Sequence, residues 1–226
     1  EKMGFNRMSW WGGWAISKYS RGAQPKNMAA IVQRCDNYSL WAYPNIGHLH
    51  PSFYAETMKK EDVPKEEWVA ISNTGEFCAA PHIAPCLYAP RFVKEVKERY
   101  SSDAAGYVEA CKGMKSLKGF ILDDEQLWHY SYHHPSAGVA DYNKYAKEWY
   151  KTTYGVEQPE TKYHKPGYVA PKGDPWIQWA KRMRILGFRP IVNTMKSAIQ
   201  AAMPEAEVSF FAGGFWADLP FYIEEF

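Results

Sequence analysis

The sequence predicts an α/β protein built on a parallel sheet, because strand-like and helix-like segments alternate along its length. No change of composition marks a linker, and there is no internal repeat or low-complexity tract. We therefore expect residues 1–226 to form a single domain, whose sheet is either open or closed into a barrel. Since a complete (β/α)8 barrel usually needs about 250 residues, a barrel here would be short or incomplete.

The N-terminal part is expected to contain a strand end, a helix and a second strand. The aromatic, Gly-rich segment 9–14 is typical of a loop or short strand end. Residues 27–37 have the apolar spacing of a helix. A strand over 39–44 follows, halted by Pro44, and 45–51 is expected to be a loop at the end of that strand.

The middle of the chain predicts a strand–turn–strand unit and two helices ahead of another strand. Residues 68–72 and 76–80 are the two strands, and Gly75 supplies the turn between them. Two helices are then expected over 91–100 and 104–112.

The C-terminal part predicts two more helical regions and a last strand. A helix over about 139–154 should end at Gly155, a normal helix stop. After a surface loop, Asp174 is expected to cap a helix that begins at Pro175. That helix is expected to break at Gly187 and Pro190 and to resume over 191–203, with a strand following over 208–212.

Composition excludes several functional classes. The chain is 46% hydrophobic and carries a net charge of only +2, with scattered basic residues, so nothing indicates binding to nucleic acid or to an anionic membrane. No apolar run approaches the roughly 20 residues of a membrane helix. Aromatic residues make up 16% of the chain, with 10 Trp and 16 Tyr, a content that suits stacking on sugar rings as well as filling a core.

The cysteines show no metal-ligand spacing. Cys78 and Cys86 flank a Pro-containing stretch and could form a disulfide in an oxidising compartment, although free buried thiols are an equal alternative for them and for Cys35 and Cys111. The chain begins at Glu1 without a signal peptide, so we expect it to be processed or a piece of something longer. Its localisation stays open, with an extracellular or periplasmic location favoured.

The segment Lys118–Glu125 is the most informative in the chain. An apolar run, Phe120-Ile-Leu122, opens into three carboxylates, Asp123, Asp124 and Glu125. A strand that is apolar on both faces lies inside a helix-covered sheet, and residues at its carboxyl end reach the edge where α/β folds bind ligands. Three adjacent like charges raise at least one pKa, as general acid catalysis at neutral pH requires. The alternative is a solvated acidic helix N-terminus.

Three features resemble the TIM-barrel glycoside hydrolases of the retaining superfamily, especially the β-galactosidase-like enzymes. Gly119–Glu125 resembles their fourth strand, which ends in an Asn-Glu or Asp-Glu pair. Pro81–Pro90 resembles the segment ahead of that strand. The run from Asp141-Tyr-Asn-Lys-Tyr145 through Trp149 and Tyr154-Gly155 to Trp176 and Trp179 resembles the segment that follows it. Together these features cover residues 40–212, and their order is more specific than any one of them.

The resemblance implies a short (β/α)8 barrel that hydrolyses glycosides. Glu125 would be the general acid/base, and Asp124 would stand where such families commonly have Asn against the sugar 2-hydroxyl. The family places a second carboxylate on a late strand. Here only Glu224 and Glu225 come late enough, and they are better interpreted as surface acids.

Further residues are candidates for binding the sugar, and no cofactor is expected. Besides Asp123 they are Trp128 and Trp216 as stacking platforms and His82 and His129 as hydrogen-bonding groups; His48 and His50 are weaker candidates at the same edge. His129, His133 and His134 could bind a metal beside the carboxylates only if they lay on a helix. Since residues 130–135 have the pattern of a loop, we predict no metal site.

Two other functions remain open. An apolar strand ending in Asp-Asp also resembles the metal site of glycosyltransferases, and the missing second carboxylate would suit a non-catalytic sugar-binding or structural subunit. Further domains or subunits are compatible with either. The sequence contains no Gly-x-Ser-x-Gly elbow and neither common nucleotide-binding glycine motif.

Overall fold

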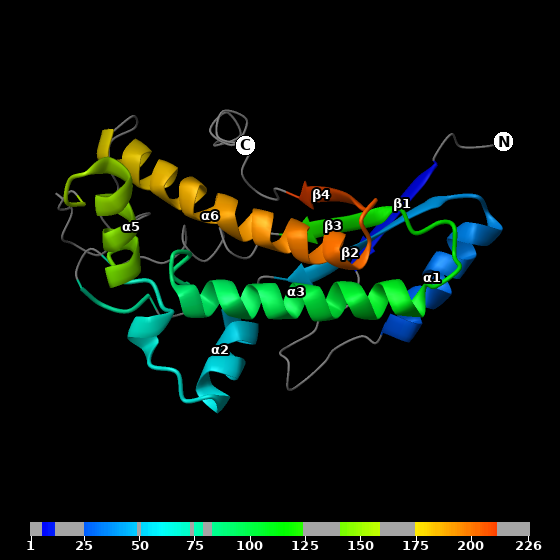
Figure 1. Ribbon diagram of the computed structural model, residues 1–226, viewed down its shortest axis with the longest axis horizontal. Helices are drawn as coiled ribbons and strands as arrows, with labels where there is room; N and C mark the ends of the chain where they lie inside the picture. The colour runs from blue at the N-terminus through cyan, green and yellow to red at the C-terminus, as the bar shows by residue number, and fades with distance from the viewer. Residues whose placement is uncertain are drawn as a thin grey trace. The chain divides into compact units, whose positions relative to one another are not determined.

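The structure, a computed structural model, describes residues 6–11, 25–48, 51–72, 75–78, 83–123, 141–158 and 175–211. The chain divides into two compact units, whose helices and strands are labelled in Figure 1. Unit 1 comprises Glu1–Leu49, Val96–Glu125 and Asn193–Gly213, and unit 2 comprises His50–Glu95, Gln126–Val192 and Gly214–Phe226.

Unit 1 is built on a parallel sheet. Its described strands are β1 (Arg7–Trp11), β2 (Trp41–His48), β3 (Gly119–Asp123) and β4 (Glu207–Phe211). They are hydrogen-bonded in the order β1-β2-β3-β4, each parallel to the next. The strand order therefore follows the chain order without the reversal that defines a doubly wound sheet. The predicted mixture of helices with a parallel sheet is confirmed.

Helices connect the strands, and α3 (Pro90–Ala110) packs against one face of the sheet. Helix α1 (Pro25–Asn37) leads into β2, α3 leads toward β3, and α6 (Pro175–Ala202) leads toward β4. The core between them holds fully buried Phe120 and Leu122 of β3. The ring of Tyr107, on α3, lies 6.1 Å from the ring of Phe120. The alternate strand residue, Ile121, is only partly buried and belongs to the opposite face.

Unit 2 contains α2 (Pro51–Lys60), the 3₁₀ turn η1 (Lys65–Glu67) and α5 (Lys144–Tyr154). Two buried side chains ahead of α5 hold this unit together. Asp141 Oδ1 accepts hydrogen bonds from the N–H groups of Ile71 and Asn143. Asn143 caps α5 by accepting from the N–H of Tyr145, and its amide donates to the carbonyl of Val69 at 2.8 Å.

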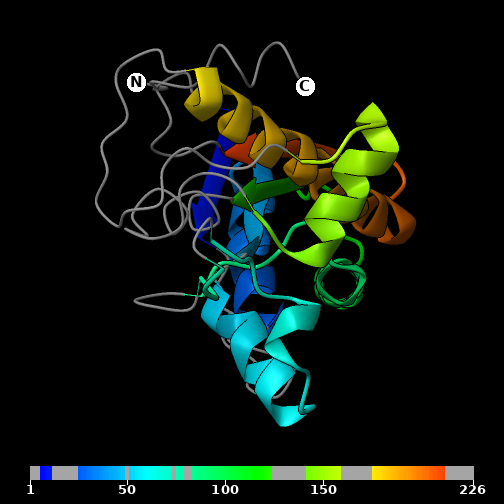
Figure 2. The ribbon, with the colours of Figure 1, turned by 90° about the vertical axis from the view of Figure 1, so that its left-hand side faces the viewer.

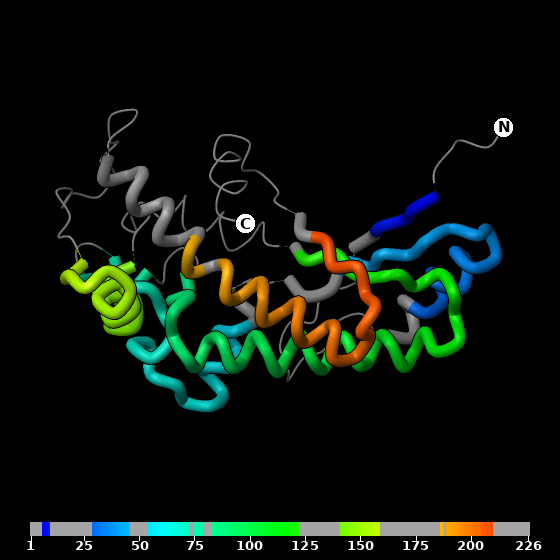
Figure 3. Tube along the Cα trace, turned by 45° about the horizontal axis from the view of Figure 1, so that its top comes forward, coloured from blue at the N-terminus to red at the C-terminus, as the bar shows by residue number. Residues whose placement is uncertain are grey.

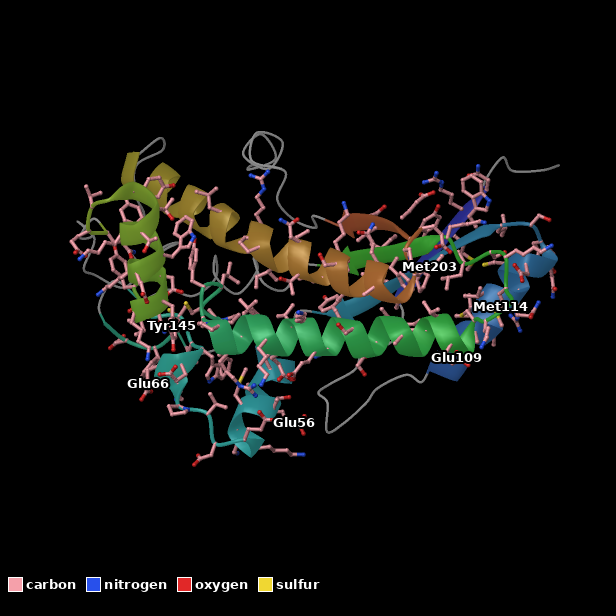
Figure 4. The ribbon with its side chains drawn as sticks, in the orientation of Figure 1. Glu56, Glu66, Glu109, Met114, Tyr145 and Met203 are labelled. Atoms are coloured by element: carbon pink, nitrogen blue, oxygen red, sulfur yellow. The ribbon has the colours of Figure 1, made fainter. Side chains whose placement is uncertain are left out.

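An exposed cluster of side chains also connects the η1 turn to the beginning of α5. Glu67 accepts hydrogen bonds from the Lys144 ammonium and the Tyr145 hydroxyl. Figure 4 shows Tyr145 at the beginning of α5, beside the η1 turn that carries Glu66. The ammonium of Lys144 is the main reason why the pKa of Glu67 is lowered. The helix ends as predicted, with Gly155 in the left-handed conformation, but it begins at Lys144 rather than at about 139.

The prediction that Pro44 halts a strand is wrong. Strand β2 runs through Pro44 to His48, into the predicted loop, and it begins at Trp41 rather than at residue 39. Ala42 is opposite Leu117 whereas Asn45 is opposite Ile121, so the register with β3 changes by one residue across Pro44. A proline, which has no N–H to donate, is tolerated in a strand at such an irregularity.

Two predicted helix breaks are also absent. Helix α3 continues through Ser101–Asp103 as one helix (Figure 3), where Asp103 pairs with Arg99 one turn earlier. Helix α6 continues through Gly187 and Pro190. A side chain at Gly187 would meet the Tyr88 ring at 2.7 Å, so this glycine serves close packing rather than a helix end.

The remaining strand and turn predictions are confirmed in part. Strand β4 covers most of the predicted 208–212, and the end of β1 covers residues 9–11 of the predicted loop or strand end at 9–14, whose other residues lie outside the described part of the chain. Within the described residues of the predicted strand–turn–strand unit, one isolated antiparallel bridge pairs Ile71 with Phe77, on either side of Gly75 with φ +83. Helix α1 is confirmed over the predicted 27–37. Helix α2 was not predicted from the sequence.

Replacing Gly119 by alanine is expected to destabilise the protein strongly. A Cβ at this position would lie 1.8 Å from the carbonyl oxygen of Glu207, so β3 and β4 would have to move apart. We expect a loss of at least about 2 kcal/mol of unfolding free energy in urea titrations. The matched control is Gly113→Ala, because Gly113 has φ +83 but open space around it. That variant should lose only about 1 kcal/mol, and an equal loss in both variants would contradict the packing argument.

Candidate functional site

The carboxyl edge of the sheet is the candidate functional site. The four parallel strands end there at Trp11, His48, Asp123 and Phe211. Figure 2, turned so that the arrowheads of Figure 1 face the viewer, looks onto this edge. In α/β folds, ligands bind outside the carboxyl ends of parallel strands.

Asp123 lies at the carboxyl edge of the sheet, as the last residue of β3. Phe120 and Leu122 are buried against the helices, as the apolar run predicts, and Asp123 is the last residue of the strand. By the two-residue period of a strand, position 123 belongs to the same face as Gly119 and Ile121. This is the face of the sheet opposite Phe120 and the helix α3 ring of Tyr107.

A β-bulge places His48 beside Asp123. Ile46 is opposite Leu122 and His48 is opposite Asp123, so Gly47 is the extra residue on β2. Bulges of this kind are frequent next to active sites, where they change the direction of a strand end. From the sequence alone, His48 was predicted to lie in a loop beyond the strand. The glycine just before it was the available signal, because an isolated glycine in a strand often marks a bulge.

The other predicted site residues lie outside the described part of the chain. These are Asp124, Glu125, Trp128, His129, His82 and Trp216, together with His50, His133, His134, Glu224 and Glu225. Most of them follow Asp123, the last residue of β3, closely in the sequence.

Behind the edge, a row of polar contacts crosses the face of the sheet opposite the helices. The Tyr43 hydroxyl donates to Glu207 Oε2 at 2.8 Å, from β2 to β4. It can span the intervening strand because Glu207 is opposite Gly119, which has no side chain. The guanidinium of Arg7 lies 3.7 Å from the same Glu207 oxygen and 5.4 Å from the Tyr43 ring. The row thus connects β1, β2 and β4 and supports the strands that form the edge.

The described residues contain neither a metal-binding cluster nor an activated cysteine. Among them, no group of three or more His, Cys, Asp or Glu side chains could hold a metal ion. All four cysteines are free and buried, which resolves the alternative between a Cys78–Cys86 disulfide and free thiols. Burial raises the pKa of Cys86 and raises that of Cys111 to about 11, so neither is an activated nucleophile. Within the described residues, none of the helices has the length and apolarity needed to span a membrane.

Comparison with protein-family models and with curated protein sequences gave no match. The solved structures that match at the level of fold include two bacterial β-galactosidases. The β-galactosidase of Bacillus circulans sp. alkalophilus is 13% identical, with a TM-score of 0.54, over 91% of this chain and 32% of that chain. The cold-adapted β-galactosidase of Rahnella sp. R3 is 12% identical, with a TM-score of 0.53, over 91% of this chain and 31% of that chain.

The fold is similar to that of these two bacterial β-galactosidases. The predicted resemblance to β-galactosidase-like enzymes is thereby confirmed as a similarity of fold. The chain spans about a third of the length of each of the two β-galactosidases.

Replacing Tyr43 by phenylalanine tests the row that supports the edge. Loss of the hydrogen bond to Glu207 should lower the unfolding free energy by about 1 kcal/mol at pH 7. Burial, followed by the bond to Glu207, raises the pKa of Tyr43 in the folded protein above its usual value of 10.0. The hydroxyl therefore stabilises the fold below about pH 10, and this contribution is lost as the pH rises through the folded pKa.

Urea titrations between pH 7 and pH 11 should show the difference between wild type and Tyr43→Phe shrinking at the alkaline end. The control is Tyr38→Phe, since Tyr38 is 76% exposed. That variant should match the wild type throughout. A difference for Tyr43→Phe that is constant or that grows above pH 10 would contradict the assigned contact.

Proposed function

We propose that residues 1–226 belong to a barrel-type catalytic domain that hydrolyses glycosidic bonds in oligo- or polysaccharides. The observation that carries this proposal is the strand β3, whose buried Phe120 and Leu122 precede Asp123 at the carboxyl edge of the sheet. The uninterrupted strand order supports a sheet that curves into a barrel, in which neighbours follow chain order. The similarity of fold to two β-galactosidases makes β-galactosides the first substrates to test.

In this proposal Glu125 is the general acid. It protonates the glycosidic oxygen as the bond from that oxygen to the anomeric carbon breaks and positive charge develops on the sugar ring. Asp124, next to it in the chain, accepts a hydrogen bond from a sugar hydroxyl, and its charge keeps the pKa of Glu125 high enough for proton donation. Asp123 lies one residue further back, at the strand end, and orients the sugar.

The remaining candidates bind the sugar around this centre. Trp128 and Trp216 stack on the rings, while His129 and His82 donate or accept hydrogen bonds. We add His48 to this group, because the bulge at Gly47 puts it opposite Asp123. A second carboxylate must complete the mechanism, either as a nucleophile about 5–5.5 Å from Glu125 or as the base for a water at about 6.5–9.5 Å.

The strand order favours a hydrolase over a glycosyltransferase. Open sheets that bind nucleotides do so where the strand order reverses. The described strands β1 to β4 contain no such reversal. The described part of the sheet therefore does not provide the crevice that a nucleotide-sugar site of this kind uses.

Replacing Glu125 by glutamine provides the test. Glutamine has nearly the same shape but cannot donate the proton, so hydrolysis of an unactivated alkyl β-galactoside should fall by about 10²–10⁴-fold. A dinitrophenyl β-galactoside, whose leaving group needs little protonation, should lose much less. The measurement is kcat/KM for both substrates in the wild type and the variant.

The matched control is Glu109→Gln, because Glu109 lies on the exposed surface of α3, paired with Lys112 (Figure 4). It should leave both rates unchanged. An unchanged alkyl-galactoside rate in Glu125→Gln would remove Glu125 from the mechanism. A wild-type protein that binds glycans but hydrolyses neither substrate would instead select a non-catalytic carbohydrate-binding subunit.

A further inference from the structure

A groove lies at the edge of unit 1 opposite the candidate active site. Its volume is about 430 Å³, and its lining residues come from the end of α1, the beginning of β2 and the segment ahead of β3: Asp36, Ser39, Leu40, Trp41, Lys115, Ser116 and Lys118. Strand β2 separates it from the carboxyl edge by seven residue steps, a distance of about 23 Å. The groove is therefore a different site from the one proposed for catalysis.

The groove is held in shape by Asp36. Its carboxylate accepts hydrogen bonds from the N–H of Ser116 at 2.6 Å and from the N–H of Lys115 at 3.2 Å. A further bond from the Ser116 side chain is the main reason why the pKa of Asp36 is lowered. The negative charge of Asp36 is thus already engaged by hydrogen bonds from Lys115 and Ser116, in the segment ahead of β3.

Ser39 occupies a backbone position where glycine is usual. It follows α1 with φ 55, and the next N–H, of Leu40, closes the helix end by donating to the carbonyl of Cys35. Glycine is preferred at this position because a side chain is strained there. A strained residue that lines a groove is a reason to look for a function of its side chain, here a hydroxyl.

An aromatic ring and two cations complete the lining. Trp41 is 39% exposed, and the guanidinium of Arg7 lies 5.1 Å from its ring. Trp41 lines the groove, and Arg7 is not among its lining residues. Lys115 and Lys118 are both exposed. The groove therefore has an indole surface, a hydroxyl and two ammonium groups, against one carboxylate that the backbone already engages.

We infer that this groove binds an acidic oligosaccharide, a chain of uronic acid residues. The C–H face of a sugar ring stacks on Trp41, the Ser39 hydroxyl meets ring hydroxyls, and the carboxylates of successive sugars pair with Lys115 and Lys118. The volume is within the range of small-molecule sites. A neutral sugar would leave the two cations unused, and a simple anion would leave Trp41 unused. The inference does not depend on the proposed hydrolysis at the opposite edge.

The test is the affinity for a galacturonic acid trimer, measured by calorimetry on the protein produced in bacteria. The wild type should bind the trimer at least about threefold more tightly than its methyl ester, which keeps the rings and removes the charge. Trp41→Ala and Lys118→Gln should each weaken binding of the acidic trimer by at least about threefold. Lys112→Gln, a lysine outside the groove, should leave it unchanged.

Ser39→Gly separates binding from stability. Glycine relieves the strain at φ 55, so this variant should unfold at a higher temperature than the wild type. At the same time it should bind the trimer at least about twofold more weakly. A general loss of folding would weaken both properties together.

Three results would overturn the inference. The first is equal affinity for the acid and its methyl ester, and the second is unchanged affinity in Trp41→Ala. The third is inorganic phosphate binding with the affinity of the trimer, which would show a simple anion site. Because none of these measurements involves hydrolysis, failure here leaves the role of Glu125 untouched, and failure of the Glu125 test leaves this groove untouched.

Discussion

The close approach of β3 and β4 at Gly119 is the constraint on which the rest of unit 1 depends. The backbone of Glu207 occupies the space that any side chain at position 119 would need. The same absence of a side chain lets the Tyr43 hydroxyl reach across β3 to Glu207. With β2, β3 and β4 held in this register, the strand that carries Asp123 ends level with its neighbours. Gly119, four residues before Asp123, thereby determines which residues lie at the carboxyl edge.

Parts of the fold could be predicted from the sequence where the structure of a segment depends on residues next to it in the chain. The apolar run Phe120–Leu122 gave a strand and Gly155 gave a helix end, because each depends on the residues beside it. The errors came from residues whose usual effect is overridden by a tertiary contact. Pro44 lies where the register with β3 changes, and Gly187 makes room for Tyr88. Helix α2 could have been found from Tyr54 and Met58, which are spaced by one turn and fully buried.

The sequence predicted what kind of site this is and where it lies, but it did not predict all of the residues that form it. A buried strand that opens into carboxylates predicts the carboxyl edge, and Asp123 lies there. The position of His48 depends on an extra residue in β2, which pairing with β3 reveals and local sequence does not. The groove at Trp41 was missed for a similar reason: Asp36 and Ser116 are far apart in sequence and meet only through the folded sheet. A site whose residues come from separate segments between strands has no short sequence motif by which it could be recognised.

An experimental structure of the Glu125→Gln variant with a bound β-galactoside would test this account of the site most directly. The account predicts that the sugar lies at the carboxyl edge, against Asp123, with the side chain of residue 125 in hydrogen-bond reach of the glycosidic oxygen. It also predicts a second carboxylate within about 5–10 Å of residue 125, facing the same cavity. A sugar bound away from this edge, or residue 125 directed into open solvent, would contradict the account.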